Sequence, residues 1–250
     1  MAAFAQQRSD LTVQAPPPVA DEPDNESGQV GAAFYRELTG HDPVDAVTED
    51  DAAFDRHVLA SILAVAAAEG GPLDERAGLS YDDLVALIAH RFPAAEGLVA
   101  GCSARPRAGE DDEVVMVRDL LLANRSRDDD IGRLLAVMVA RRAVEPNHLW
   151  EDLGLRDRSE LSRLLNRHFA PLASRNTKNM RWKRFFYRAL CEDDGLVMCS
   201  TPVCSRCGDF DLCFGDESGE SRLAYQRRVL ALKVASLPDS GEIVPPRSLP

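Results

Sequence analysis

Four cysteines lie close together near the C-terminal end of the chain, with the spacing C-x4-C-x2-C-x5-C. They are Cys199, Cys204, Cys207 and Cys213, in a chain with six cysteines in all. Thiolates are soft ligands, and four of them on one short segment can reach a single zinc ion or an iron–sulfur cluster. The spacing therefore predicts a metal-binding loop over residues 199–213.

The spacing alone leaves the metal open. The first three cysteines match the start of the plant-type ferredoxin pattern, but the fourth follows six residues later instead of far downstream. Zinc sites usually pair two C-x2–4-C units across a spacer of roughly a dozen residues or more, and this segment has no such spacer. An iron–sulfur cluster is therefore favoured, with zinc as the alternative and unligated thiols as the third possibility.

The composition excludes some classes of function. The chain has 41 Asp and Glu against 29 Lys and Arg, a net charge of −12, so a general affinity for nucleic acid or for an anionic membrane is not expected. The first residues lack the basic region and apolar core of a signal peptide, and no apolar run is long enough to span a bilayer. We expect a cytoplasmic protein, in which thiols stay reduced and serve as metal ligands before disulfides.

The elements that must position the cysteines are helices. Helix-start residues followed by apolar residues at spacings of three and four predict an all-α domain with an irregular cysteine loop. We expect a disordered, Pro-rich acidic tail over residues 1–30, a helical domain over 31–235 and a flexible Pro-rich end over 236–250. The expected helices begin near Thr48–Asp51, Ser80, Asp112, Asp128–Asp130, Asp157 and Asn176–Thr177, with a last helix over residues 219–235.

Basic residues gather just before the cysteines. Residues 133–191 hold 13 Lys and Arg against five acids, whereas residues 192–220 hold one Arg and eight acids. Arg181, Arg184 and Arg188 recur at helical spacing, on the side opposite the aromatic residues of the same helix. With Lys178 and Lys183 they could attract an oxyanion or an acidic partner. The alternative is a solvated face, or salt bridges to the acidic helices that come earlier in the chain.

Three other residues are weaker candidates. Cys191 lies eight residues before Cys199 and could be an extra thiol near the metal, although a buried small hydrophobic residue is the more common role. His168 is expected to be a packed histidine, and His148 is a weak ligand candidate. Because no nucleophile–base pair, phosphate-binding Gly loop or HExxH motif is present, we do not expect an enzyme.

Three sequence segments resemble the NifQ proteins of nitrogen fixation. They are NHLWEDLGL (147–155), RNTKNMRWKRFFYRALC (175–191) and the cysteine segment that ends in CFGDE (213–217). The resemblance extends over roughly residues 35–220. It implies that Cys199, Cys204, Cys207 and Cys213 hold an iron–sulfur cluster containing molybdenum.

The resemblance also implies a function for the bound molybdenum. The protein would be a carrier that takes molybdenum from molybdate and donates it during assembly of the iron–molybdenum cofactor. Its partners would be the cofactor scaffold and the reductase that acts with it. Two other classes of function stay open: a structural zinc-loop interaction protein, and an iron–sulfur redox or sensor protein.

Overall fold

The computed structural model describes residues 23–99, 109 and 111–193, and within these residues the chain is helical and contains no strand. The predicted all-α class is confirmed for this part of the chain. The longer helices are α1 (Pro23–Thr39), α2 (Asp51–Ala68), α4 (Tyr81–Arg91), α5 (Asp112–Ala123), α6 (Asp130–Ala143), α8 (Arg158–His168) and α10 (Trp182–Asp193). The short elements are η1 (Pro43–Asp45), α3 (Leu73–Ala77), η2 (Pro93–Val99), α7 (Leu149–Asp152) and α9 (Ala170–Ala173).

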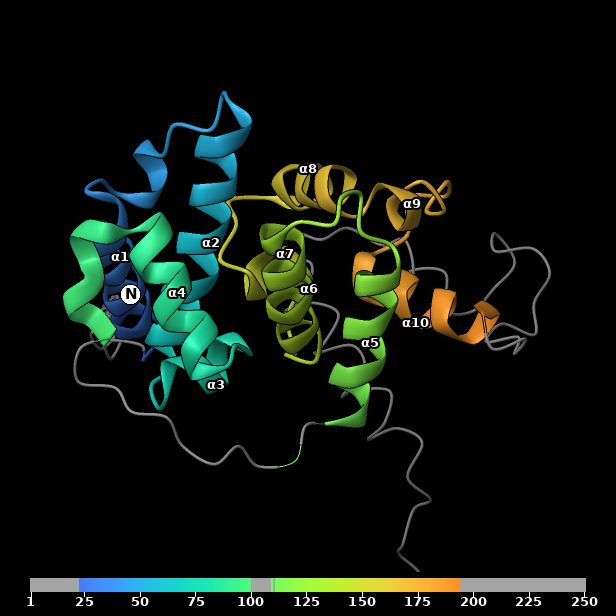
Figure 1. Cartoon of the computed structure of the whole chain (residues 1–250), viewed down its shortest axis with the longest axis horizontal. Coiled ribbons are helices and arrows are strands. Elements are labelled where there is room, and N and C mark those ends of the chain that lie inside the picture. The colour runs from blue at the N-terminus through green and yellow to red at the C-terminus, as the bar shows by residue number, and fades with distance from the viewer. Residues whose placement is uncertain (1–22, 100–108, 110, 194–250) are drawn as a thin grey trace, which may run out of the picture.

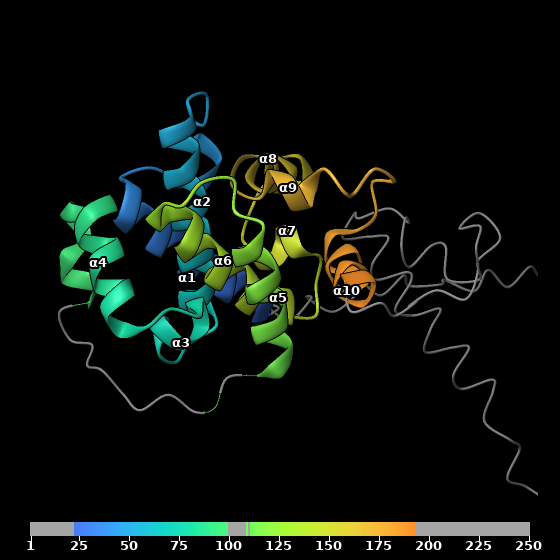
Figure 2. The same cartoon turned by 45° about the vertical axis from the view of Figure 1, so that its right-hand side comes forward.

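The helices α1 to α4 gather at one end of the molecule, and α8 to α10 lie toward the other, with α6 and α7 between them (Figures 1 and 2). Helix α2 packs along α1, α5 packs along α6, and α10 packs against α5. Buried apolar residues cover nearly every side of α2, including Leu59, Ile62 and Leu63. A helix that is apolar all round must lie inside the protein, and this agrees with the packing of α1 and α3 against α2.

Most predicted helix starts are confirmed by their caps. Side-chain oxygens of the residues before α2, α4, α5, α6 and α8 accept hydrogen bonds from backbone N–H groups of the first turn, which otherwise have no intrahelical partner. These capping residues are Asp50, Ser80, Asp111, Asp129 and Asp157. Acidic residues in the same first turns also suit the positive end of the helix dipole.

The predicted start of α10 at Asn176–Thr177 is wrong, because the helix begins at Trp182. The Asn176 side chain closes a turn on Met180, where its Oδ1 accepts from the backbone N–H at 2.8 Å and its Nδ2 donates to the carbonyl at 2.9 Å. Asn179 has a left-handed backbone with φ of 53°. Side-chain hydrogen bonds to the backbone thus replace the first helical turn that the apolar spacing predicted.

The boundary of the N-terminal tail also differs from the prediction. Helix α1 begins at Pro23, so residues 23–30, which the sequence placed in the tail, are helical. Proline at the first position of a helix loses no hydrogen bond, and this makes Pro23 a suitable start. The remainder of the predicted tail, the end over 236–250 and the expected helix over 219–235 lie outside the described residues. No helix in the described ranges is long and apolar enough to cross a membrane.

Two buried acid–histidine pairs join α2 to α8. His168 is packed as predicted, and its Nε2 donates to Asp55 Oδ1 at 2.8 Å. His57 Nε2 donates to Glu160 Oε2 at 3.3 Å, and the Tyr35 hydroxyl lies 2.8 Å from the other nitrogen of the same ring. These pairs connect segments more than a hundred residues apart and fix α8 on the central helix.

Candidate functional site

The four predicted metal ligands lie outside the described residues, and the structure describes the helix that leads to them. Helix α10 ends at Asp193, six residues before Cys199. Cys191 lies in its last turn as a half-buried free thiol. In residues 23–99, 109 and 111–193, no group of three or more His, Cys, Asp or Glu could hold a metal ion. The described part of the site is therefore α10 and its surroundings.

Three aromatic residues anchor α10 in the core, as the sequence predicted. Trp182, Phe185 and Phe186 are all buried, and Phe186 is completely enclosed. The Trp182 and Phe185 rings meet edge to face, with centroids 5.7 Å apart and an interplanar angle of 83°. Trp182 Nε1 also donates to Ser162 Oγ of α8 at 3.4 Å. These contacts hold the first two turns of α10 firmly against the domain.

A buried polar relay gives α10 a second anchor. Lys183 Nζ donates to Asp152 Oδ2 at 2.5 Å and also to the carbonyl of Glu145. The carbonyl of Asp152 accepts from Arg142 Nε at 2.8 Å, and Arg142 Nη1 donates to Glu69 Oε2 at 2.9 Å. The relay runs from the end of α2 through α6 and α7 to α10.

Burial of the Lys183–Asp152 ion pair, at the end of this relay, is energetically unfavourable. Burial raises the pKa of Asp152, and the hydrogen bond and charge of Lys183 oppose that shift. Burial likewise lowers the pKa of Lys183, against the pull of Asp152. Both groups are displaced toward their neutral forms, so each needs the other in order to stay charged. Lys183, which the sequence placed among possible anion contacts, is thus already committed to Asp152.

The structure divides the three predicted arginines into two kinds. Arg181 and Arg184 both line a cavity of about 410 Å³ at the start of α10. Arg188 is outside that lining, and its Nε donates to Glu192 Oε1 at 2.6 Å on the same helix. An i, i+4 pair of this kind is ordinary surface stabilisation. Arg188 therefore fits the alternative reading from the sequence, in which the arginines form salt bridges. Its partner, however, lies in α10 itself and not in one of the earlier acidic helices.

The cavity lies between the segment before α7, one residue of α8, and α10. Its lining contains cations, aromatic and apolar residues, but no Asp or Glu: Pro146, Asn147, His148, Leu149, Leu161, Arg181, Trp182, Lys183, Arg184 and Tyr187. His148 caps α7, and its backbone N–H donates to Glu151 Oε2 at 3.0 Å. Two of the sequence segments that carried the family resemblance, 147–155 and 175–191, thus meet in one place.

Two lining residues were not singled out from the sequence. Asn147 forms a side-chain hydrogen bond with Asp152, which helps to keep that carboxylate ionised. Burial, followed by a hydrogen bond to Glu113, raises the pKa of Tyr187. Glu113 lies in the first turn of α5, so Tyr187 ties α10 to α5. Asn147 lies in segment 147–155 and Tyr187 in segment 175–191. Both segments carry the family resemblance, and this was the sequence signal that could have identified the two residues.

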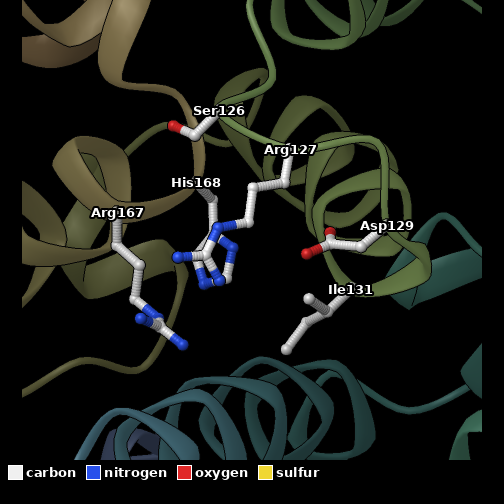
Figure 3. A pocket seen from close by; sticks show the side chains of 6 residues that line it. All are labelled: Ser126, Arg127, Asp129, Ile131, Arg167 and His168. Atoms are coloured by element: carbon white, nitrogen blue, oxygen red, sulfur yellow. The ribbon is translucent and has the colours of Figure 1, made fainter.

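A second cavity lies at the junction of the α5–α6 connection and α8. It measures about 50 Å³, and Figure 3 shows the six side chains around it. Arg167 and His168 both bind Asp55, and Asp129 caps α6 by accepting from the Gly132 N–H at 2.8 Å. Asp129, Arg167 and His168 are therefore already used to hold helices together.

Comparison with known proteins agrees with the resemblance in sequence. The chain is 41% identical to a NifQ homologue of Sinorhizobium fredii over 172 residues, which cover 67% of this chain and 75% of the relative. It is 42% identical to the NifQ protein of Rhodobacter capsulatus over 161 residues, which cover 64% and 87% of the two chains. With the NifQ protein of Azotobacter vinelandii it shares 47% over 106 residues, or 42% and 54%. No solved structure matches the chain.

The family comparison covers both the described helices and the cysteines. The NifQ family model matches residues 58–215, which is more than half of the chain. This range starts within α2, includes the cavity at the start of α10, and extends past Cys213. The chain belongs to the NifQ family.

Proposed function

We propose that this protein carries an iron–sulfur cluster containing molybdenum, and donates the molybdenum for assembly of the iron–molybdenum cofactor in nitrogen fixation. The observation that carries the proposal is that the match to the NifQ family spans all four cysteines of the C-x4-C-x2-C-x5-C segment. Family membership supports an accessory role in nitrogen fixation. The soft thiol set supports a thiophilic cargo.

In this proposal Cys199, Cys204, Cys207 and Cys213 hold the cargo, and Cys191 is close enough in sequence to be a further thiol beside it. Iron and sulfide come from cluster-assembly proteins, and molybdenum comes from molybdate. The receivers are the cofactor scaffold and its reductase partner. The protein acts as a carrier without turnover of its own, and α10 is the firmly anchored helix from which the cysteine segment extends.

The experiment that tests the proposal is anaerobic purification after expression with molybdate. We expect a brown protein that contains iron, acid-labile sulfide and molybdenum. Zinc without iron would favour the structural zinc-loop alternative. Iron and sulfide without molybdenum, under molybdate-replete expression, would favour the redox or sensor alternative.

Single substitutions then test the ligands. Cys204→Ala and Cys207→Ala each remove a thiolate from the tight C-x2-C pair, so most of the visible absorbance and most of the metal should be lost. The helical far-UV circular dichroism should be retained, because the helices described here have apolar faces of their own. Cys102→Ala removes a cysteine outside the cluster and is the matched control. Absorbance like that of the unmodified protein in both test variants would refute the ligand assignment.

A further inference from the structure

We infer that the cavity at the start of α10 is a docking site for residues 209–217 of this same chain, the acidic and aromatic stretch around the last cysteine. The chain would then turn back along α10 after leaving the end of that helix. The inference goes beyond the proposed function, because it concerns a contact within the chain and holds for any metal that the thiols bind.

The lining of the cavity suits an occupant that is both apolar and acidic. Leu149, Leu161 and Trp182 contribute apolar surface, and no Asp or Glu is among the lining residues. Arg184 is half-buried in the same lining and forms no ion pair within the described ranges. Apolar side chains would remove the first surface from water, and a carboxylate would give Arg184 a counter-charge.

The stretch that follows the helix has this composition. Residues 209–217 read DFDLCFGDE, with four acids and no Lys or Arg. Phe210, Leu212 and Phe214 lie between or beside the acids, so carboxylates and large apolar side chains are neighbours in sequence. The family match over residues 58–215 includes both the cavity and most of this stretch.

Charge and position favour this stretch over the other segments outside the described residues. Residues 221–250 have five Lys and Arg against two acids, and residues 100–110 have two Arg against one acid, so both are net positive. A cavity lined by cations and by no acid disfavours them. Residues 1–22 join α1, which belongs to the other end of the molecule (Figure 1). The acidic segment that begins at α10 remains.

The connection is long enough for this contact. Helix α10 has 12 residues and is therefore about 18 Å long. Fifteen residues lie between Asp193, at its end, and Asp209, and about six extended residues would already span the helix. The others leave room for the cysteines to gather on one metal. A short tether also gives an effective concentration in roughly the millimolar range, so contacts of modest strength are sufficient.

The test is site-specific photo-crosslinking in the full chain, purified anaerobically. Pro146 is an exposed residue of the cavity lining, so p-benzoylphenylalanine at this position reports what lies beside the cavity. Mass spectrometry should identify crosslinks to residues 209–217, and mixing with isotopically labelled chain should show that they form within one molecule. Glu37, exposed on α1, is the control position and should give no crosslink to residues 209–217.

Two pairs of variants test the contacts. Arg184→Gln removes a charge of the lining and should lower the crosslink yield by about threefold or more, whereas Arg188→Gln, outside the lining, should keep it within about 1.5-fold. The double change Phe210→Ser and Phe214→Ser removes apolar anchors and should lower the yield by about tenfold. Tyr225→Ser, beyond the docking stretch, is its control. Circular dichroism checks that each variant is folded.

Several outcomes would overturn the inference. Crosslinks from Pro146 to residues 1–22, 100–110 or 221–250, or to a second copy of the chain, would identify a different occupant, and absence of any crosslink would mean that the cavity has none. Equal losses in the Arg184→Gln and Arg188→Gln variants would show only a long-range charge effect. The crosslink is independent of the metal content. A chain that crosslinks at residues 209–217 but holds no molybdenum contradicts the proposed function and leaves the docking in place, and a chain that holds molybdenum without the crosslink does the reverse.

Discussion

Replacement of Glu160 by Gln should remove much of the acid-sensitive stability of this fold. The Glu160 carboxylate accepts from His57 Nε2 at 3.3 Å, from the Arg156 backbone N–H at 2.8 Å and from Arg156 Nε at 2.6 Å. Glutamine has the same shape, but it carries no charge, and its amide places donors where two donors already point. The substitution therefore leaves the donors of His57 and Arg156 in place and removes the carboxylate charge that they stabilise.

The magnitude follows from the pKa of this carboxyl. Burial acts to raise the pKa of Glu160, but hydrogen bonds from His57 and Arg156 outweigh it and lower the pKa from 4.5 to about 2. At about 1.4 kcal/mol per pH unit, this fall corresponds to about 3 kcal/mol of folding free energy at neutral pH. A lowered native pKa gives stability that is present above pH 4.5. That stability is lost as the pH falls toward 2, since the unfolded state takes up the proton first.

The assay is urea unfolding of the metal-free chain at several pH values between about 2.5 and 7, followed by circular dichroism. We expect the Glu160→Gln variant to be about 3 kcal/mol less stable at pH 7, and the difference to shrink steadily below pH 4.5. Glu37→Gln, at an exposed position of α1, is the control and should stay within about 0.5 kcal/mol. Two parallel stability curves for the Glu160→Gln variant and the unmodified chain would refute the reasoning, as would equal stability at pH 7.

Two further predictions concern packing and the relay, and urea unfolding at pH 7 measures both. Gly154 has φ of +68°, and an added Cβ would lie 2.6 Å from Val65 Cγ2, so Gly154→Ala should cost about 3 kcal/mol or more. Gly40→Ala, at φ of +85° with open space around it, should cost only about 1 kcal/mol, and similar costs for the two would contradict the packing argument. Lys183→Met should cost about 3 kcal/mol by stranding Asp152, and a second change, Asp152→Asn, should recover much of the loss. A double variant that is as unstable as the single one would show that the buried charge is not the cause.

The helices could be predicted because their signals are local. Caps such as Asp50, Ser80 and Asp157 lie directly before apolar residues at helical spacing, and the structure places helix starts there. The start of α10 was missed because Asn176 binds the backbone of Met180, a competition that apolar spacing does not reveal. Residues 23–30 were assigned to the tail because their composition is polar, although they form the first turns of α1.

The candidate site was less predictable because its contacts join distant segments. Lys183 and Asp152 are 31 residues apart, and no periodicity could indicate that they pair across a buried space. Arg184 and Arg188 looked equivalent in sequence, and only the neighbours of α10 show that one lines a cavity and the other pairs within its helix. The four cysteines were recognised by spacing and resemblance, and their role as metal ligands stays a prediction.

The relay from Glu69 through Arg142 and Asp152 to Lys183 has a consequence for local opening of the fold. A helix that makes few contacts can open at little cost. Here α10 cannot separate without leaving the Asp152 carboxylate buried and unpaired, at a cost of several kcal/mol. Arg142, whose side chain is 1% exposed, donates to the carbonyl of Asp152 and pairs with Glu69 at the end of α2. In terms of hydrogen exchange, we therefore expect the amides around Lys183 to form one cooperative unit with those of α2 and α6, and to open when the centre of the protein opens.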